Sequence, residues 1–234
     1  MTNSSTITSI LGTDISPIAI GLFSSPPEGV AKWQSGPVPA GCAFWREAQN
    51  GKSFYTTPED HYNCAVGCYT HAIPLPQARE QELMQTVGFM VESNYISMDE
   101  IPGIPKLAAS PQFIAYGPVD EAGFTPTMVV VAVAPSAAML LYEATLAAGA
   151  GKPLMNVLGR PGCAIVPLTK ELQGVSISLG CRGNRTFTGL PDSRLYLCIP
   201  GNKWDAVVEK LVEVDTANKK MGSYYESKLD QPLA

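Results

Sequence analysis

Hydrophobic residues are most concentrated in the window Met128–Leu146. Its first part, Met128–Ala134, is entirely apolar and rich in valine, a pattern typical of a central strand that is covered on both faces. A helix is expected to follow over Pro135–Ala148, with Ser136 as its N-cap. Because the proline break and Glu143 interrupt the window, it lacks the roughly 20 unbroken apolar residues that a membrane-spanning helix needs.

Shorter apolar runs between turn-forming residues predict the other elements. Strands are expected over Pro17–Phe23, Gln112–Tyr116, Val175–Leu179 and Arg194–Ile199. Helices are expected over Thr2–Gly12, Pro76–Val91, Lys203–Val214 and Ala217–Lys228. Strands and helices alternate without a regular βαβ period, and no repeat or long linker divides the chain. We therefore predict a single α/β (α+β) domain over residues 1–234, a mixed sheet with helices packed on its faces.

The dipeptide Asn50-Gly51 predicts a tight hairpin turn, because both residues tolerate positive φ angles. The paired strands would be Cys42–Ala48 and Lys52–Thr56, and residues 58–68 would form a polar loop. In such a strand, alternate residues from Cys42 to Arg46 would share one face.

Composition narrows the classes of protein. Hydrophobic residues make up 45% of the chain, charged residues only 16%, and the formal net charge is −5. The low charge density favours a homo-oligomer, and the lack of any lysine- or arginine-rich run argues against nucleic-acid binding. The first residues carry no positive charge ahead of an apolar stretch, so no secretory signal or membrane association is expected and the protein is predicted to be cytoplasmic.

Six cysteines are present, at positions 42, 64, 68, 163, 181 and 198. In a reducing compartment disulfides are the least expected outcome, which leaves burial, metal ligation or redox chemistry. Cys198 lies within an apolar run, Leu195–Ile199, and is expected to be a core residue.

The segment Gly180–Arg185 carries the strongest local signal for chemistry. It follows an apolar strand, and Gly183 allows close approach of the backbone to a ligand. Arg182 and Arg185 present fork-shaped cations that suit a carboxylate or phosphate, and cations beside Cys181 favour its thiolate. The alternative is a tight turn whose arginines pair with acidic residues elsewhere.

The segment His61–Cys68 offers spacings that can serve a metal. A complete site needs four ligands, and no second close pair of cysteines exists. Iron-sulfur clusters accept ligands from dispersed positions in the chain. The four cysteines other than Cys68 and Cys198 would therefore suffice if the fold brought them together. We therefore predict a metal site, an iron-sulfur cluster or zinc, made by Cys42, Cys64, Cys163 and Cys181. Simple burial of these thiols is the alternative.

Three further residues lie near these cysteines in the sequence. Arg160 precedes Cys163 in a Gly-Arg-Pro-Gly turn, and Arg46 follows Cys42, so both join the candidate anion-binding residues. His61 follows two acidic residues and is a candidate general base, against the commoner case of a structural histidine.

Taken together, these motifs resemble the domain-of-unknown-function family 169, a group of uncharacterised archaeal and bacterial proteins. The resemblance rests on residues 17–23 and 27–30, Gly41–Arg46, Glu59–Cys64, Gly159–Cys163 and Ser178–Arg185. It implies a shared fold and a cysteine at the positions of Cys42, Cys64, Cys163 and Cys181, with a small residue expected at position 68. It implies no substrate.

Three functions follow as hypotheses. The leading one is a cysteine-based metal or iron-sulfur protein that binds a small anionic molecule, for a redox or lyase-type reaction. The second is a non-enzymatic binding or accessory protein with packed cysteines. The third is a thiol nucleophile, Cys181 or Cys64, with His61 as its base.

Overall fold

The computed structural model of the chain describes residues 4–150 and 156–229. Its strands are β1 (Ile18–Phe23), β2 (Phe54–Thr56), β3 (Phe113–Pro118), β4 (Met128–Val133), β5 (Asn156–Leu158), β6 (Ser176–Ser178) and β7 (Leu195–Pro200). Its α-helices are α1 (Ser4–Leu11), α2 (Ala43–Gln49), α3 (Ala65–Thr70), α4 (Gln77–Glu92), α5 (Pro135–Ala147), α6 (Ile165–Leu172), α7 (Arg182–Thr188) and α8 (Trp204–Glu226). Short 3₁₀ helices are η1 (Pro58–His61), η2 (Met98–Gly103), η3 (Gly162–Ala164) and η4 (Gly201–Lys203).

The described strands form one sheet in the order β2-β3-β1-β4-β7-β6-β5. Neighbouring strands are antiparallel from β2 through to β6, and β5 adds to the edge parallel to β6. The central strand β4 pairs Val130 with Ile18 of β1 and with Cys198 of β7. The fold is therefore α+β, with an open sheet.

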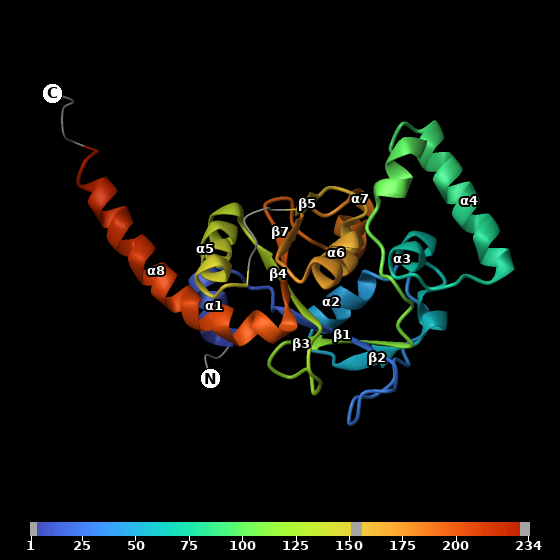
Figure 1. Ribbon diagram of the computed structural model, residues 1–234, viewed down its shortest axis with the longest axis horizontal. Coiled ribbons are helices and arrows are strands. Elements are labelled where there is room, and N and C mark those ends of the chain that lie inside the picture. The colour runs from blue at the N-terminus through green and yellow to red at the C-terminus, as the bar shows by residue number, and fades with distance from the viewer. Residues whose placement is uncertain (1–3, 151–155, 230–234) are drawn as a thin grey trace.

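Helices cover both faces of the sheet (Figure 1). Helices α1, α5 and α8 pack on one face, against Val129, Val131 and Val133 of β4. Helices α2, α3, α6 and α7 lie on the other, where β4 presents Met128 and Val130. Every residue of β4 is buried, which confirms the prediction of a strand covered on both sides.

The apolar pattern located most of the regular elements. Strands β1, β3, β4, β6 and β7 and helices α1, α4 and α5 lie within a residue or two of the predicted ranges. Thr2 and Asn3, included in the first predicted helix, lie outside the described residues.

The predicted hairpin is wrong. Residues Ala43–Gln49 form helix α2, and only β2 survives from the expected strand pair. Gly51 does adopt a positive φ of 89°, but it lies just after the end of a helix, where glycines with positive φ are also common. The prediction that alternate residues from Cys42 to Arg46 share a face falls with the hairpin.

Other boundaries also differ. Residues 58–68 contain η1 and the first part of α3 instead of a loop, and Arg182–Arg185, expected to lie in a turn, form the start of α7. Ala134, not Ser136, stands at the N-cap position of α5. The two helices expected near the C-terminus are one, α8, because the polar residues around Thr216 continue the helix without a break.

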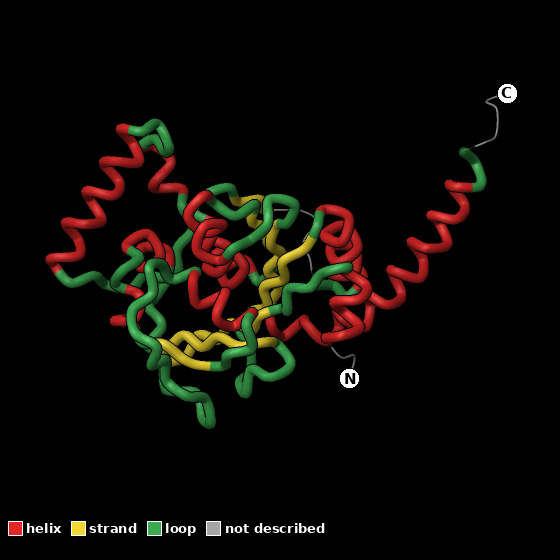
Figure 2. The backbone as a smooth tube through the Cα atoms, turned by 180° about the vertical axis from the view of Figure 1, so that it is seen from behind, coloured by secondary structure: helices red, strands yellow, loops and turns green. Residues whose placement is uncertain are grey.

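Two segments extend from opposite ends of the molecule, as Figures 1 and 2 both show. One is the arm, defined here as Gln77–Gly103, which contains α4 and η2; none of the residues of α4 is buried. The other is the C-terminal half of α8. No helix in the described part of the chain has the length and apolar character to cross a membrane.

Candidate functional site

The four cysteines singled out by the sequence lie close together in the fold. Helix α2, which follows Cys42, packs on α7, which follows Cys181. Helix α3, which follows Cys64, packs on η3, which contains Cys163. The Cys163 thiol lies near enough to the other three for their charges to raise its pKa. The Cys42 thiol lies equally within reach of the charges of Cys64 and Cys181. We call Cys42, Cys64, Cys163 and Cys181 the cysteine cluster.

Each member of the cluster stands at or beside a helix start. Cys42, Cys64 and Cys181 occupy the N-cap positions of α2, α3 and α7, and Cys163 lies in the 3₁₀ turn that leads into α6. The backbone N–H of Gly67 donates to Cys64 Sγ at 3.3 Å, and that of Asn184 donates to Cys181 Sγ at 3.4 Å. Such donors stabilise a thiolate over a thiol.

The glycine at position 67 fits this arrangement closely. A Cβ atom there would lie 2.8 Å from Cys64 Sγ, so any other residue would displace the sulfur from its N–H donor. The sequence therefore sets the position of the Cys64 thiol through a glycine three residues further on.

Three of these thiols, those of Cys42, Cys64 and Cys163, hold their protons at neutral pH because burial raises their pKa values. Burial raises the pKa of Cys42 to about 12, with the neighbouring Cys64 and Cys181 adding to the rise. Burial also raises the pKa of Cys64, and raises that of Cys163 well above its ordinary value. A metal bound here would therefore release protons from the thiols.

The remaining two cysteines have other surroundings. The Cys68 thiol is fully buried and donates to the His61 carbonyl at 3.2 Å, which turns it toward its own helix start. Cys198 is fully buried in β7, as predicted for a core residue. All six cysteines are unpaired. Within residues 4–150 and 156–229, no three His, Cys, Asp or Glu side chains converge closely enough to hold one metal ion.

The two histidines lie in a buried layer beside the cluster. His61 Nε2 lies 2.8 Å from Thr56 Oγ1, whose own hydrogen is donated to the Ile114 carbonyl. His61 Nε2 therefore carries the proton and Nδ1 is free of one. That Nδ1 faces Gly41, where a Cβ atom would lie only 3.2 Å away.

Both histidines are neutral at physiological pH. Burial lowers the pKa of His61 to about 3 and that of His71 to about 4. The carboxylate of Asp60, which precedes His61 in the sequence, accepts the backbone N–H of Thr57 at 2.8 Å and so begins η1. His61 packs against Phe44 and Tyr116 and is placed as a core residue behind the cluster.

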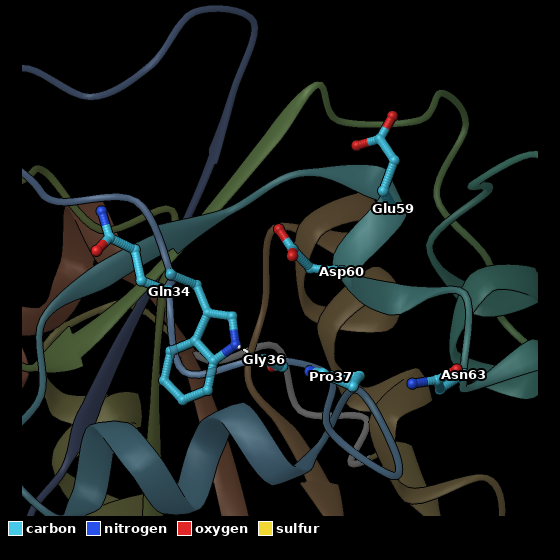
Figure 3. A pocket seen from close by; sticks show the side chains of 7 residues that line it. Gln34, Gly36, Pro37, Glu59, Asp60 and Asn63 are labelled. Carbon is cyan, nitrogen blue, oxygen red and sulfur yellow. Dashed lines mark hydrogen bonds between the residues drawn. The ribbon is translucent and has the colours of Figure 1, made fainter.

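A recess in the surface lies near this layer but is chemically different from it (Figure 3). Its lining contains neither a cysteine nor an arginine and consists of Trp33, Gln34, Gly36, Pro37, Glu59, Asp60 and Asn63. With two carboxylates and no cation in its lining, the recess is a poor site for the predicted anion.

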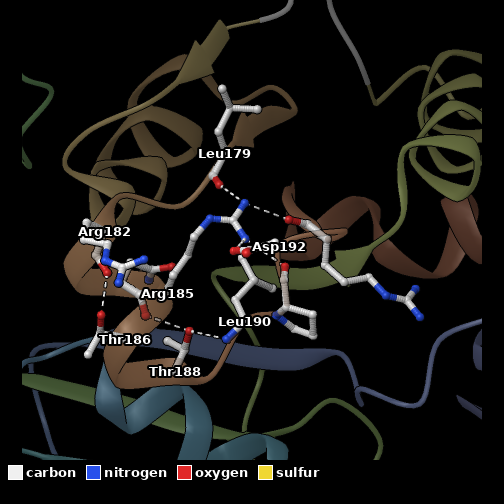
Figure 4. Close-up of polar contacts among 10 residues, drawn as sticks. Leu179, Arg182, Arg185, Thr186, Thr188, Leu190 and Asp192 are labelled. Carbon is white, nitrogen blue, oxygen red and sulfur yellow. Dashed lines mark hydrogen bonds and ion pairs between the residues drawn. The ribbon is translucent and has the colours of Figure 1, made fainter.

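The Arg185 guanidinium is occupied by hydrogen bonds to backbone carbonyl groups (Figure 4). Its guanidinium donates to the carbonyls of Leu179, Pro191 and Arg194 at 2.5–2.9 Å. Asp192 lies 3.9 Å from it. These bonds tie the end of β6 to the loop before β7 and leave Arg185 little capacity for a ligand.

Arg160 holds the arm against the body of the protein. Its guanidinium pairs with Glu100 at 3.2 Å and lies over the ring of Tyr95, 5.0 Å from the ring centroid. The Tyr95 hydroxyl also accepts the backbone N–H of Arg182 at 3.4 Å. The arm is thus fixed beside two members of the cluster, Cys163 and Cys181.

Two arginines remain available for an anion. Arg46, on α2, and Arg182, on α7, are exposed, and the described residues provide no partner for either guanidinium. Gly183 lies in the first turn of α7, where a Cβ atom would meet only Phe187 at 3.8 Å, so the structure does not require a glycine there.

Asn184 also lies at the site, although the sequence pattern did not single it out. Only 2% of this residue is exposed, and its side-chain nitrogen and oxygen both lack a full hydrogen bond to the described residues. The amide lies beside the Cys42 sulfur, where it lowers the thiol pKa against the effect of burial. Its place three residues after Cys181, the usual distance between a cap and the N–H that it accepts, was the signal available.

Comparison with known proteins supports the resemblance drawn from the motifs. One curated relative is the uncharacterized protein MJ0308 of Methanocaldococcus jannaschii, 25% identical over 166 residues that cover 68% of this chain and 70% of the relative. No solved structure matches the chain. The sequence profile of DUF169, described as an uncharacterised ArCR family, matches residues 6–210. The chain therefore belongs to the DUF169 family.

Proposed function

We propose that the protein binds a metal centre, an iron-sulfur cluster in the first place, through the thiolates of Cys42, Cys64, Cys163 and Cys181. The observation that carries the proposal is that four thiols, each at a helix start, lie near enough for their charges to raise one another's pKa. Among the described residues no three of them lie close enough to hold a single ion, so their spacing suits a cluster of several iron atoms better than one ion. Four cysteines are the usual ligand set of [2Fe–2S] and [4Fe–4S] clusters and of structural zinc.

The local environment suits an anionic centre. Backbone N–H groups already point at the sulfurs of Cys64 and Cys181, so part of the stabilisation of thiolates is built in before a metal arrives. The aromatic layer of Phe44 and Tyr116 beside the cluster keeps water from that side. A dry and donor-lined site stabilises a cluster against hydrolysis and sets its reduction potential.

The spacing of the ligands favours a cluster over zinc. Structural zinc sites are built from close cysteine pairs, and the only close pair here is Cys64 and Cys68. Because Cys68 is turned to the His61 carbonyl, it does not complete such a pair. Four single ligands from distant segments are the pattern found for some clusters.

Full coordination by four cysteines favours electron transfer over a lyase reaction, since a lyase needs an iron with an open position. At the rim, Arg182 and Arg46 would hold a small carboxylate or phosphate by charge-assisted hydrogen bonds. Exposed apolar side chains on the two extensions, Phe89 on α4 and Tyr225 on α8, support the further proposal of a homo-oligomer.

The alternative is a binding or accessory protein in which the cysteines only fill space. The raised pKa values of Cys42 and Cys163 favour it, because protonated thiols are good core side chains. The thiol-nucleophile hypothesis is weaker, since the raised pKa of Cys64 disfavours its thiolate at neutral pH.

Metal analysis of protein purified without oxygen separates these proposals. Iron together with acid-labile sulfide would support the cluster, and zinc without sulfide would support a single-ion site. Protein that contains neither metal nor sulfide would leave the accessory-protein alternative. Rapid alkylation of Cys64 or Cys181 at neutral pH in that metal-free protein would revive the nucleophile.

A further inference from the structure

Asn184 is unusual among the buried polar residues of this protein. Its amide carries two hydrogen-bond donors and an acceptor, yet neither atom makes a hydrogen bond of normal geometry with the described residues, and the Cys42 sulfur lies beside it only as a weak partner. Buried amides without partners destabilise the folded state, so an apolar residue of similar size would serve the fold better. The fold alone therefore gives no reason for an asparagine here.

The surroundings of Asn184 are the loops that carry the cysteine cluster. A Cβ atom at Gly162, next to Cys163, would lie 3.1 Å from Asn184 Cβ, and one at Gly180, next to Cys181, would lie 3.2 Å from Asn184 Oδ1. Two glycines thus make room for this side chain. Its own backbone N–H donates to Cys181 Sγ, and its amide lies beside the Cys42 sulfur.

We propose that Asn184 is a positioning residue whose side-chain N–H donates a hydrogen bond to the sulfur of metal-bound Cys42 or to a sulfide of the cluster. The inference rests on the proposed function. A neutral thiol is a weak acceptor, whereas a metal-bound thiolate is a strong one, so the bond forms fully only when the centre is bound. Asn184 therefore stabilises the metal-bound protein, whereas its unpaired amide destabilises the metal-free form.

The bond also affects the reduction potential. Reduction adds negative charge to the cluster, and a donor aimed at its sulfur stabilises that charge. Asn184 accordingly raises the reduction potential, and residues without a donor at this position lower it.

The experiment compares wild type with Asn184→Leu, which keeps the approximate size and removes the amide. In the metal-free form, thermal unfolding should show the variant to be as stable as wild type or more stable. After reconstitution with iron and sulfide, the variant should have a more negative midpoint potential and hold iron about 10–100-fold less tightly, the usual effect of losing an outer-shell partner.

Two further variants sharpen the result. Asn184→Asp keeps the shape but has no donor and adds charge, so its midpoint potential should be lower still. Asn218→Leu makes the same substitution on α8, where the amide donates to the Val214 carbonyl, and should leave the potential unchanged.

The outcomes separate the inference from the proposed function. Wild-type protein that takes up no metal overturns both. A loaded wild type whose Asn184→Leu variant has the same potential and the same iron retention overturns only the role of Asn184. Clear destabilisation of the metal-free variant also overturns it, because that result would make Asn184 a structural residue.

Discussion

The two faces of the sheet are built from the same strands but differ in chemistry. The buried core of the aliphatic face, under α1, α5 and α8, consists of valine, leucine, isoleucine and alanine together with Trp204. The cysteine face, under α2, α3, α6 and α7, holds five of the six cysteines in its core or packed against it, and most of the buried aromatic rings. Along β7, Leu197 and Ile199 point to the first face, and Tyr196 and Cys198 to the second.

The difference shows how one sheet can use one face for packing alone and the other for polar and reactive side chains. A strand that is buried on both sides can use one set of alternate residues for packing alone. The other set is then free to carry polar and reactive groups, provided that they find partners. We therefore expect substitutions on the aliphatic face to change stability and leave metal binding intact, and substitutions in the cysteine cluster to do the reverse.

The largest effect is expected from the cluster itself. Cys163→Ser should abolish stable incorporation of iron and sulfide, because the remaining three thiolates leave one metal without its ligand. Cys198→Ser is the matched control on the same face, and it should load normally while losing some stability. The ratio of iron to protein after anaerobic reconstitution measures both, and equal loading of the two variants would contradict the assignment.

A large effect of another kind is expected on the aliphatic face. Leu141 of α5 is fully buried there, and Leu141→Ala should lower the free energy of unfolding by about 2–5 kcal/mol through lost burial and the cavity left behind. Denaturant unfolding gives this value. The folded variant should hold as much metal as wild type, and a loss of metal would show that the faces are coupled.

Acid should weaken the cysteine face through its histidines. The pKa values of His61 and His71 are about 3 and 4 in the folded protein and near 6.5 when unfolded. The unfolded chain therefore binds more protons below pH 6.5, so stability is complete above that pH and falls toward pH 4. Two protons give a slope of at most about 2.7 kcal/mol per pH unit.

His71→Gln tests this origin directly. The substitution should halve the part of the pH dependence of the unfolding free energy that comes from the histidines, to roughly 1.4 kcal/mol per pH unit. Urea unfolding of metal-free protein at several pH values between 4 and 7 compares the two. Identical slopes would mean that carboxylates alone cause the acid sensitivity.

The smallest effect on stability is expected from the arm. Arg160→Gln removes an exposed ion pair with Glu100, so the unfolding midpoint should barely change. The arm should nevertheless become more accessible, and limited proteolysis within Gln77–Gly103 should be several-fold faster. Arg79→Gln, which removes an ion pair within α4 itself, is the control and should not speed cleavage between the arm and the body.

The elements that depend on local pattern could be predicted from the sequence. The valine run of β4 and the apolar pattern of α5 identify those elements without knowledge of the fold. Asn50-Gly51 misled because positive φ angles occur at helix ends as well as in hairpins, and only packing of Phe44 and Trp45 against the sheet decides for α2.

The candidate site was only partly predictable. Turn-rich surroundings distinguished the four cluster cysteines from Cys198, but their proximity depends on contacts between distant segments, such as those of Cys42 and Cys181 and those of Cys64 and Cys163. Arg185 and Arg160 looked like ligand-binding cations, because no local pattern tells a guanidinium bound to carbonyls or to Glu100 from a free one. Asn184 offered only one signal, its place three residues after Cys181.

The most direct test of the central claim is reconstitution of the wild-type protein with iron and sulfide, without oxygen, beside a variant in which Cys42, Cys64, Cys163 and Cys181 are all serine. The wild type should be coloured and contain iron and sulfide in comparable amounts, and the variant should fold but be colourless and contain neither. A wild type that stays colourless, or a four-serine variant that loads equally well, would contradict it.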